Sequence, residues 1–520
     1  MRYWFKSKFD SKSKFDSKSK SKSNSKSKSK SKFAHNRFTR KKTVHQNTSS
    51  SCPPNTSFDD CELAILRSAV DKVEQIKGKE KLNNDTIKSI IQIVETFIQK
   101  KKCICYGGTA INNILPRYDQ FYNKDVEFPD YDFFSPNAYE HAKQLADIYY
   151  KEGFTEVYAS AGMHEGTYKV FVNFIPVADI TQMHRDLFRN IQKHAILRDR
   201  IFYAPANYLR MAMYLELSRP EGDVSRWEKV LKRIRLLNKH YPLKSSQCSS
   251  KAIQRIFESN NLPPGDVFIL MRDILVDEKV VFFGAMANKM YSRYLPKSVS
   301  HTLQKIPDFD VLSETPLDTV RNIERALVEK GVDVEVIQHK GVGEIIAPHY
   351  EILIDGDTVA FVYEPIACHS YNTLKVGGHI MRIATIDTML SFYLAFLYSD
   401  RPYYDKDRIL CMCEFMFTVQ QKNRLAQRGL LRRFSIKCVG KQDTIEDMRA
   451  HKAEKFKALK HKKGTKEYEK VFMRYIPSET RKKRRTETKK KSGSGLGSRR
   501  KSKSKSRSRS GLSTLRNLFT

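Results

Sequence analysis

Two short stretches decide the fold of this chain: Cys103-Ile-Cys-Tyr-Gly-Gly-Thr-Ala-Ile-Asn-Asn-Ile114 and Pro129-Asp-Tyr-Asp-Phe-Phe-Ser135. The first is typical of a short apolar strand that runs through a glycine turn into a helix. The second is typical of a strand that carries two carboxylates. Because side chains alternate between the two faces of a strand, we expect Asp130 and Asp132 to point to the same side.

Carboxylates this close repel each other unless a cation lies between them. An exposed Asp-x-Asp on a loop is the simpler alternative, since that pattern is common in any sequence. The glycine turn favours a metal site, because Gly107 and Gly108 allow the backbone to approach a phosphate at a helix N-terminus. A third carboxylate, Asp179, lies in the segment 176–181, which predicts a further short strand.

The three carboxylates form a hard oxygen site that suits two Mg²⁺ or Mn²⁺ ions. Such ions activate an attacking hydroxyl and stabilise a leaving pyrophosphate. Gly107, Gly108 and Thr109 are then expected to hold the phosphates of a nucleoside triphosphate. This combination predicts nucleotidyl transfer to a 3′-hydroxyl, with Asp179 placed to accept the hydroxyl proton. For Asp179 alone, a strand-end cap is the alternative.

The net charge of +36 is spread unevenly over the 520 residues. Residues 1–46 carry 16 Lys or Arg and 2 Asp, and residues 477–520 carry 16 Lys or Arg and 2 Glu. Each tail therefore has a charge of +14, which leaves +8 for residues 47–476. Both tails are rich in Lys-Ser or Arg-Ser repeats, so we expect them to be disordered and to bind nucleic acid without sequence preference.

The nine cysteines include two Cys-x-Cys pairs, Cys103/Cys105 and Cys411/Cys413, but no Cys-x-x-Cys pair. Because both pairs lie in apolar runs, we expect buried, reduced thiols in a reducing compartment. The longest apolar run, residues 389–398, is too short to span a bilayer, and no secretory signal opens the chain.

The spacing of apolar residues and breakers predicts the main elements. Helices are expected at 61–76, 86–98, 138–150 and within 205–240, and strands at 103–106, 155–159, 168–174 and 176–181. The highly charged residues 442–475 predict a long solvated helix.

The pattern of the first half then recurs. Pro129-Asp-Tyr-Asp-Phe-Phe-Ser135 reappears as Pro307-Asp-Phe-Asp-Val-Leu-Ser313, an offset of 178 residues. Further matches in the same order are Tyr106-Gly107 with Phe283-Gly284, Gly153 with Gly331, Pro176–Asp179 with Pro365–Cys368, Arg219-Pro220 with Arg401-Pro402, and Asp223/Arg226 with Asp405/Arg408. We therefore predict two copies of one α/β unit.

The second copy differs where chemistry is expected. Ala285-Met286 replaces Gly108-Thr109, which closes the approach to the backbone and removes a hydroxyl. Cys368 replaces Asp179 in this alignment, although the neighbouring Glu364 leaves that match open. The second copy is therefore expected to be a degenerate unit without a working site.

The motifs resemble those of the polymerase-β-like nucleotidyltransferases, through Gly107-Gly108-Thr109, Asp130-x-Asp132 and Asp179. Within that superfamily, the stretches 106–112, 129–135 and 172–181 are similar to the poly(A) polymerase catalytic subunits of large DNA viruses. The mimivirus type is the nearest, and the poxvirus enzymes are more distant. The resemblance extends from about residue 60 to residue 430.

This resemblance implies that Asp130, Asp132 and Asp179 are catalytic metal ligands and that ATP is the favoured substrate. The expected activity is polynucleotide adenylyl transfer to RNA 3′ ends by a two-metal mechanism. Base choice does not follow from the metal chemistry, and Asn112 is a candidate nucleotide contact. Two alternatives stay open: a non-catalytic basic protein that binds or packages RNA, and a nucleotidyltransferase of uridylyl- or CCA-adding preference.

The predicted fold class is α+β, with five segments. These are a Lys/Ser-rich tail (1–50), a catalytic domain with a helical part (51–243), a degenerate copy (244–430), a charged helical extension (431–476) and a second basic tail (477–520). The expected partners are RNA, ATP and either a second copy or a processivity partner docked on the degenerate domain. The resemblance implies a location in the viral factory of the host cytoplasm, with packaging in the virion as a further expectation. Nuclear import through the basic residues 481–485 is an alternative.

Overall fold

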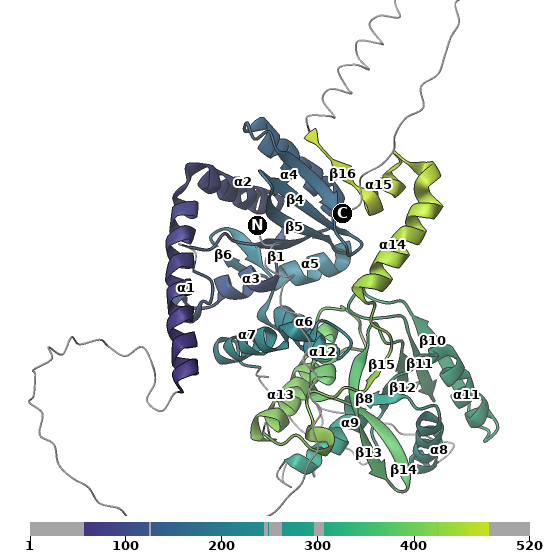
Figure 1. The fold of residues 1–520 in the computed structure, drawn as a ribbon. Coiled ribbons are helices and arrows are strands. Elements are labelled where there is room, and N and C mark those ends of the chain that lie inside the picture. Colours follow the sequence, from purple (N-terminus) through teal and green to yellow (C-terminus); the bar gives the residue numbers. More distant parts are fainter. Residues whose placement is uncertain are drawn as a thin grey trace, which may run out of the picture. The chain divides into compact units, whose positions relative to one another are not determined.

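The computed structural model describes residues 57–123, 126–243, 248, 263–295, 306–423 and 425–477. The chain divides into two compact units, Met1–Ala69 and Val70–Thr520, and helix α1 (Phe58–Asn83) belongs to both. Both sheets lie within the second unit (Figure 1). The two predicted tails fall outside the described residues, apart from Pro477, as does the basic cluster 481–485.

The first sheet has eight strands in the order β16-β3-β4-β5-β2-β1-β7-β6. Strands β5 and β2 are parallel, β2 and β1 are antiparallel, and β1 and β7 are parallel. The strand bounds are β1 Ile104–Cys105, β2 Tyr131–Ser135, β3 Val157–Ala161, β4 Thr167–Val172, β5 Ile175–Gln182, β6 Ile196–Arg198, β7 Ile201–Tyr203 and β16 Arg474–Tyr475.

Helices of this first lobe begin and end where the sequence predicts breaks. Helix α2 starts after Asn84, whose side chain accepts a hydrogen bond from the Thr86 amide at 2.8 Å. Helix α4 ends before Gly153, whose φ of +99° is the left-handed conformation that glycine favours. The helix bounds are α2 Asp85–Lys101, α3 Gly107–Ile114, α4 Ala138–Lys151, α5 Arg185–Lys193, α6 Ala206–Leu217 and α7 Trp227–His240.

The second sheet also has eight strands, in the order β10-β11-β12-β9-β8-β14-β13-β15 (Figure 1). Its strands are β8 Val281–Phe283, β9 Phe309–Leu312, β10 Val334–His339, β11 His349–Ile354, β12 Asp357–Tyr363, β13 His369–Val376, β14 His379–Ala384 and β15 Cys438–Val439. Its main helices are α8 Pro264–Asp277, α9 Gly284–Tyr291, α11 Pro316–Val328, α12 Ile386–Phe396 and α13 Lys406–Asn423.

Seven strands of each sheet share one topology. In the second sheet, β12 and β9 are parallel, β9 and β8 antiparallel, and β8 and β14 parallel, which repeats the central pairings of the first sheet. Gly107 and Gly284, which open α3 and α9, have φ values of +73° and +63°. Asp223 and Asp405 each accept a hydrogen bond from a backbone amide at the start of the next helix.

The structure corrects one alignment of the two halves. Asp179 in β5 is paired with Asp132 in β2, and the corresponding partner of Asp310 in β9 is Phe361 in β12. Cys368 lies beyond the end of β12 and is therefore not the counterpart of Asp179. The Pro-x-Ala match misled because an eight-residue β5 and a seven-residue β12 start at different points relative to their prolines.

The expectation of reduced thiols is only partly right. Cys103, Cys105 and Cys413 are free and buried, as predicted. Disulfides join Cys368 to Cys438 and Cys248 to Cys411, and Cys61 is also disulfide-bonded. These partners are 70 and 163 residues apart in sequence, so spacing along the chain gives no sign of them.

The charged extension is not one long helix. Helix α14 (Ile445–Leu459) and helix α15 (Lys466–Phe472) are separated by Gly464, whose φ is +93°. A capping box between Thr444 and Asp447 opens α14. The segment then returns to the first sheet, where β16 pairs with the edge strand β3. None of the described helices is long and apolar enough to cross a membrane.

Candidate active site

Strands β2 and β5 bring the predicted carboxylates together. Asp132 and Asp179 are directly opposite each other in the parallel register of these two strands. Asp130 is exposed and lies one residue before β2, so it is not within the strand as predicted. Its charge nevertheless acts on Asp132, which places the two carboxylates near each other.

Gly107 lies against Asp132. A methyl group built on Gly107 would be 2.6 Å from Asp132 Oδ2, which is closer than real side chains approach. The amide of Tyr106 donates to the Asp132 carbonyl oxygen at 2.9 Å, which fixes the glycine turn beside β2. The turn therefore needs glycine for its left-handed φ and also for the space that the carboxylate fills.

The surroundings of Asp132 disfavour its charged form. Burial, together with the charges of Asp130 and Asp179, raises its pKa to about 7, against opposing effects from Lys169 and Arg226. A divalent cation at this point would offset both the burial and the repulsion. The oxygen donors of Asp130, Asp132 and Asp179 fit a hard ion such as Mg²⁺ or Mn²⁺.

Asp179 has a second partner across the sheet. Lys169 in β4 is its paired residue on the other side, and the Lys169 ammonium forms an ion pair with Asp179 Oδ2. In this arrangement the lysine holds the carboxylate that is predicted to accept a proton.

Thr109 and Asn112 hold the backbone around the site. The Thr109 hydroxyl donates to the Asp130 carbonyl oxygen at 2.7 Å, which ties helix α3 to the start of β2. Asn112 is 1% exposed, and its Oδ1 accepts from the amides of Phe121 and Tyr122, both at 2.8 Å. Direct nucleotide contact by these two residues stays a prediction, whereas their positioning contacts are seen here.

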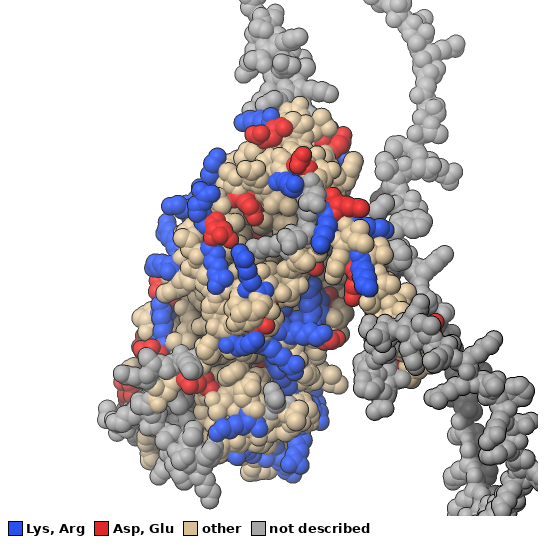
Figure 2. Space-filling view, turned by 90° about the vertical axis from the view of Figure 1, so that its left-hand side faces the viewer, with Lys and Arg blue, Asp and Glu red and all other residues tan. Residues whose placement is uncertain are grey.

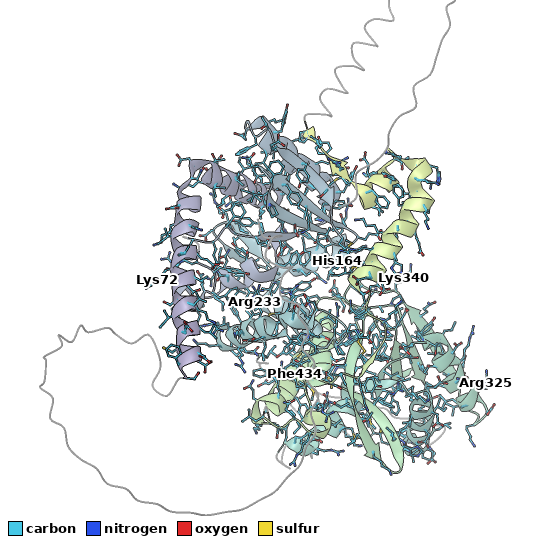
Figure 3. All side chains as sticks on the ribbon, in the orientation of Figure 1. Lys72, His164, Arg233, Arg325, Lys340 and Phe434 are labelled. Carbon is cyan, nitrogen blue, oxygen red and sulfur yellow. A yellow bond between two sulfur atoms is a disulfide. The ribbon has the colours of Figure 1, made fainter. Side chains whose placement is uncertain are left out.

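A cavity of about 1080 Å³ opens beside the end of β5. From the first lobe it is lined by Phe134, Thr181 and Tyr208, together with His164, which is labelled in Figure 3. Tyr106 stacks on Phe134 with ring centroids 3.9 Å apart and hydrogen-bonds to Thr181 Oγ1 at 2.9 Å. This aromatic floor next to the carboxylates has room for a nucleotide or an RNA end.

Several polar residues of the site were missed by sequence reasoning. Arg226 forms an ion pair with Glu216 at 2.9 Å, and its charge lowers the pKa of Asp132. Arg233 reaches the glycine turn, since a methyl group built on Gly108 would be 2.8 Å from its Nη2. The spacing of Arg226, Lys229 and Arg233 by three and four residues was the available signal, because it places three cations on one helix face.

The corresponding place in the second lobe is closed. Asp310 lies against Gly284 as Asp132 lies against Gly107. Asp308 and Met286 are only 5% and 3% exposed, and Phe361 stands where the first lobe has Asp179. The described second lobe therefore keeps the glycine turn but has no open group of three carboxylates.

The segment that carries this site is similar to known proteins. Residues 92–223, which contain all three aspartates and the glycine turn, match the family model described as "Poly(A) polymerase catalytic subunit". Over 180 residues the chain is 35% identical to a "Putative poly(A) polymerase catalytic subunit" of African swine fever virus, which is 34% of this chain and 38% of that relative. The corresponding subunit of Acanthamoeba polyphaga mimivirus is 30% identical over 185 residues, 34% of this chain and 30% of the relative.

A likeness of fold extends further than the likeness of sequence. The crystal structure of the Megavirus polyadenylate synthase matches with a TM-score of 0.68 at 20% identity, over 86% of this chain and 92% of that chain. The chain spans less than two fifths of the length of the curated relatives it matches. The resemblance inferred from the motifs is thus confirmed for the segment that carries the site, and the fold is shared more widely.

Proposed function

We propose that this protein is a poly(A) polymerase, a nucleotidyltransferase that adds AMP from ATP to RNA 3′ ends. The observation that carries the proposal is the placement of Asp132 and Asp179 on paired strands against the glycine turn of Gly107 and Gly108. This arrangement lies within the segment that matches the poly(A) polymerase catalytic family. A sheet that carries half-buried carboxylates next to an open helix N-terminus suits transfer between a triphosphate and a hydroxyl.

The chain's own residues supply most of the positioning in this mechanism. Asp130, Asp132 and Asp179 would hold two divalent ions, Mg²⁺ or Mn²⁺, which supply positive charge to the phosphates and lower the pKa of the attacking hydroxyl. The first amides of α3 orient the phosphates, because no side chain caps that turn. Asp179 takes the hydroxyl proton once its ion pair with Lys169 loosens.

We infer that the second lobe is a degenerate copy of the first. The repeated strand order and the two left-handed glycines support a common origin. Phe361 and Met286 support the loss of chemistry, since they replace a carboxylate and a hydroxyl with apolar groups. The second lobe then serves as a docking surface for RNA, for a processivity partner or for a second copy of the chain. The expected location of the protein is the viral factory in the host cytoplasm.

Extension of a labelled RNA primer tests the proposal. The purified chain is incubated with the primer, Mg²⁺ or Mn²⁺ and each nucleoside triphosphate in turn. We expect long products with ATP and at most a few additions with the other three. Equal extension with UTP or CTP would refute adenylate preference, and no extension with any triphosphate would favour the RNA-binding alternative.

A further inference from the structure

Arg233 is a buried cation on α7 without a described counter-charge. Its side chain is labelled in Figure 3, and the residue is 9% exposed. The guanidinium lies 4.9 Å from the ring centroid of Phe121 and 5.6 Å from that of Tyr122, and its Nη2 donates to the Tyr122 hydroxyl at 2.6 Å. No carboxylate among the described residues forms an ion pair with it. A buried charge in this state is costly unless an anion completes its surroundings.

The free side of this guanidinium is at the glycine turn. A methyl group on Gly108 would lie 2.8 Å and 3.1 Å from its two terminal nitrogens. Tyr106, the N-cap of α3, offers no side-chain hydrogen bond to the first turn, and the two glycines have no side chains to do so. The uncapped amides and the guanidinium therefore converge on one point, where the helix terminus already favours negative charge.

Two more cations precede Arg233 in the chain, Lys229 within α7 and Arg226 at the N-cap of that helix. Lys229 lies one turn before Arg233, and Arg226 lies three residues before Lys229. Lys229 is exposed, but partial desolvation lowers its pKa, the charges of Arg233 and Arg226 lower the pKa further, and Asp130 raises it. These three cations therefore form a row from the carboxylates to the glycine turn: Arg226, Lys229 and Arg233. Such a row suits a ligand that carries several adjacent negative charges.

Asn112 has a part in this arrangement. Because its Oδ1 accepts from the amides of both Phe121 and Tyr122, it fixes the two aromatic rings on which Arg233 stacks. A guanidinium held by stacking and by a hydroxyl loses little freedom when it binds an anion, and its planar fork suits two phosphate oxygens. Asn112 is thus a positioning residue for Arg233.

We propose that Arg233 and Lys229 bind the β- and γ-phosphates of the nucleoside triphosphate and the pyrophosphate that leaves. This subsite rests on the proposed function for its role in catalysis. The expected ligand is a polyphosphate, because the cations lie close together beside the carboxylates and the glycine turn. An RNA backbone would instead need cations along an extended groove. An RNA backbone phosphate would be the competing ligand, and the test separates the two.

The binding test uses the full chain in buffer without divalent metal, with inorganic tripolyphosphate as the probe in calorimetry. We compare Arg233→Gln with Arg235→Gln, a matched control on the same helix whose side chain is exposed. Loss of a charged donor predicts binding weakened about 10- to 100-fold in Arg233→Gln and changed by less than about twofold in the control. Both variants keep the basic tails, so any background binding is the same.

A second variant guards against loss of folding. Lys229 is exposed, and Lys229→Gln disturbs no packing; we expect it to weaken tripolyphosphate binding about threefold to tenfold. In RNA extension assays, both variants should raise the KM for ATP and leave the KM for the primer unchanged. Wild-type tripolyphosphate binding in Lys229→Gln and in folded Arg233→Gln would overturn the proposal, as would a loss confined to primer affinity.

The two proposals fail in different ways. A chain that binds tripolyphosphate through Arg233 but extends no RNA with any triphosphate keeps the anion subsite and loses the proposed function. A chain that polymerises adenylate while Arg233→Gln binds tripolyphosphate like the wild type keeps the function and loses the subsite.

Discussion

Gly107 shows how a single residue joins backbone geometry to chemistry. Its φ of +73° turns the chain from β1 into α3, and the space where a side chain would be is filled by the Asp132 carboxylate. Gly284 repeats both features in the second lobe, where no open site exists. The glycine is therefore required by the fold, and the residues that distinguish the first lobe from the second are Gly108, Thr109 and Asp179.

Replacement of Gly107 by alanine separates strain from chemistry. Gly153→Ala is the matched control, because Gly153 also has a positive φ but has nothing within 4 Å of an added methyl group. Both variants should lose about 1 kcal/mol of unfolding free energy from left-handed strain, and Gly107→Ala should lose more through its clash with Asp132. Urea unfolding and primer extension measure the two effects. Full polymerase activity in Gly107→Ala would contradict this geometry.

At the scale of elements, the C-terminal extension belongs to the first lobe. Met473, just before β16, is 3% exposed, and the Tyr475 hydroxyl donates to Asp147 at 2.7 Å. Lys143 of α4 forms an ion pair with Glu469 of α15 at 2.8 Å. A segment that follows the second lobe in sequence is thus built into the edge of the first sheet.

Met473→Ala tests that assignment. Truncation of a buried methionine should lower the unfolding free energy by about 2 to 4 kcal/mol. Met163 is 42% exposed, and Met163→Ala should change the unfolding free energy by less than about 0.5 kcal/mol. Urea unfolding of the two variants gives the comparison. Equal stability of both variants would show that the extension is not packed on the first sheet in solution.

The sequence was informative where function depends on neighbours in the chain or on a repeated motif. It predicted the glycine turn, the Asp130/Asp132 pair and the strand of Asp179, because each is a local pattern. It missed Arg233, which lies 125 residues after Gly108 and reaches it only through the packing of α7. It misaligned Cys368 for a related reason, since only strand pairing shows that Phe361 is the partner of Asp310.

At the scale of the whole molecule, most of the net positive charge belongs to the two terminal segments of the sequence. Figure 2 shows Lys and Arg side chains spread over one face of the described part, with Asp and Glu between them. Residues 1–46 and 477–520 contribute +28 of the +36. If the chain extends RNA as proposed, charge of that size would favour retention of the RNA product through counterion release, and this retention would weaken as salt rises.

Removal of both tails should therefore shorten products more than it slows single additions. The truncated chain, residues 47–476, is compared with the full chain at low and moderate salt, with product length and the rate of the first addition as the readouts. We expect the difference in product length to be present at both salt concentrations and to narrow as salt rises, because retention through counterion release weakens with salt. Equal product lengths at moderate salt would refute a role for the tails in retention.

The central claim is that adenylyl transfer occurs at the carboxylates of the first lobe and not at their counterparts in the second. Incorporation of labelled ATP into an RNA primer by Asp132→Asn and by Asp310→Asn tests it directly, since both residues lie against an equivalent glycine. We predict a loss of at least about a thousandfold in Asp132→Asn and a change of less than about threefold in Asp310→Asn. Near-normal activity in Asp132→Asn, or an equal loss in Asp310→Asn with its fold intact, would contradict the account.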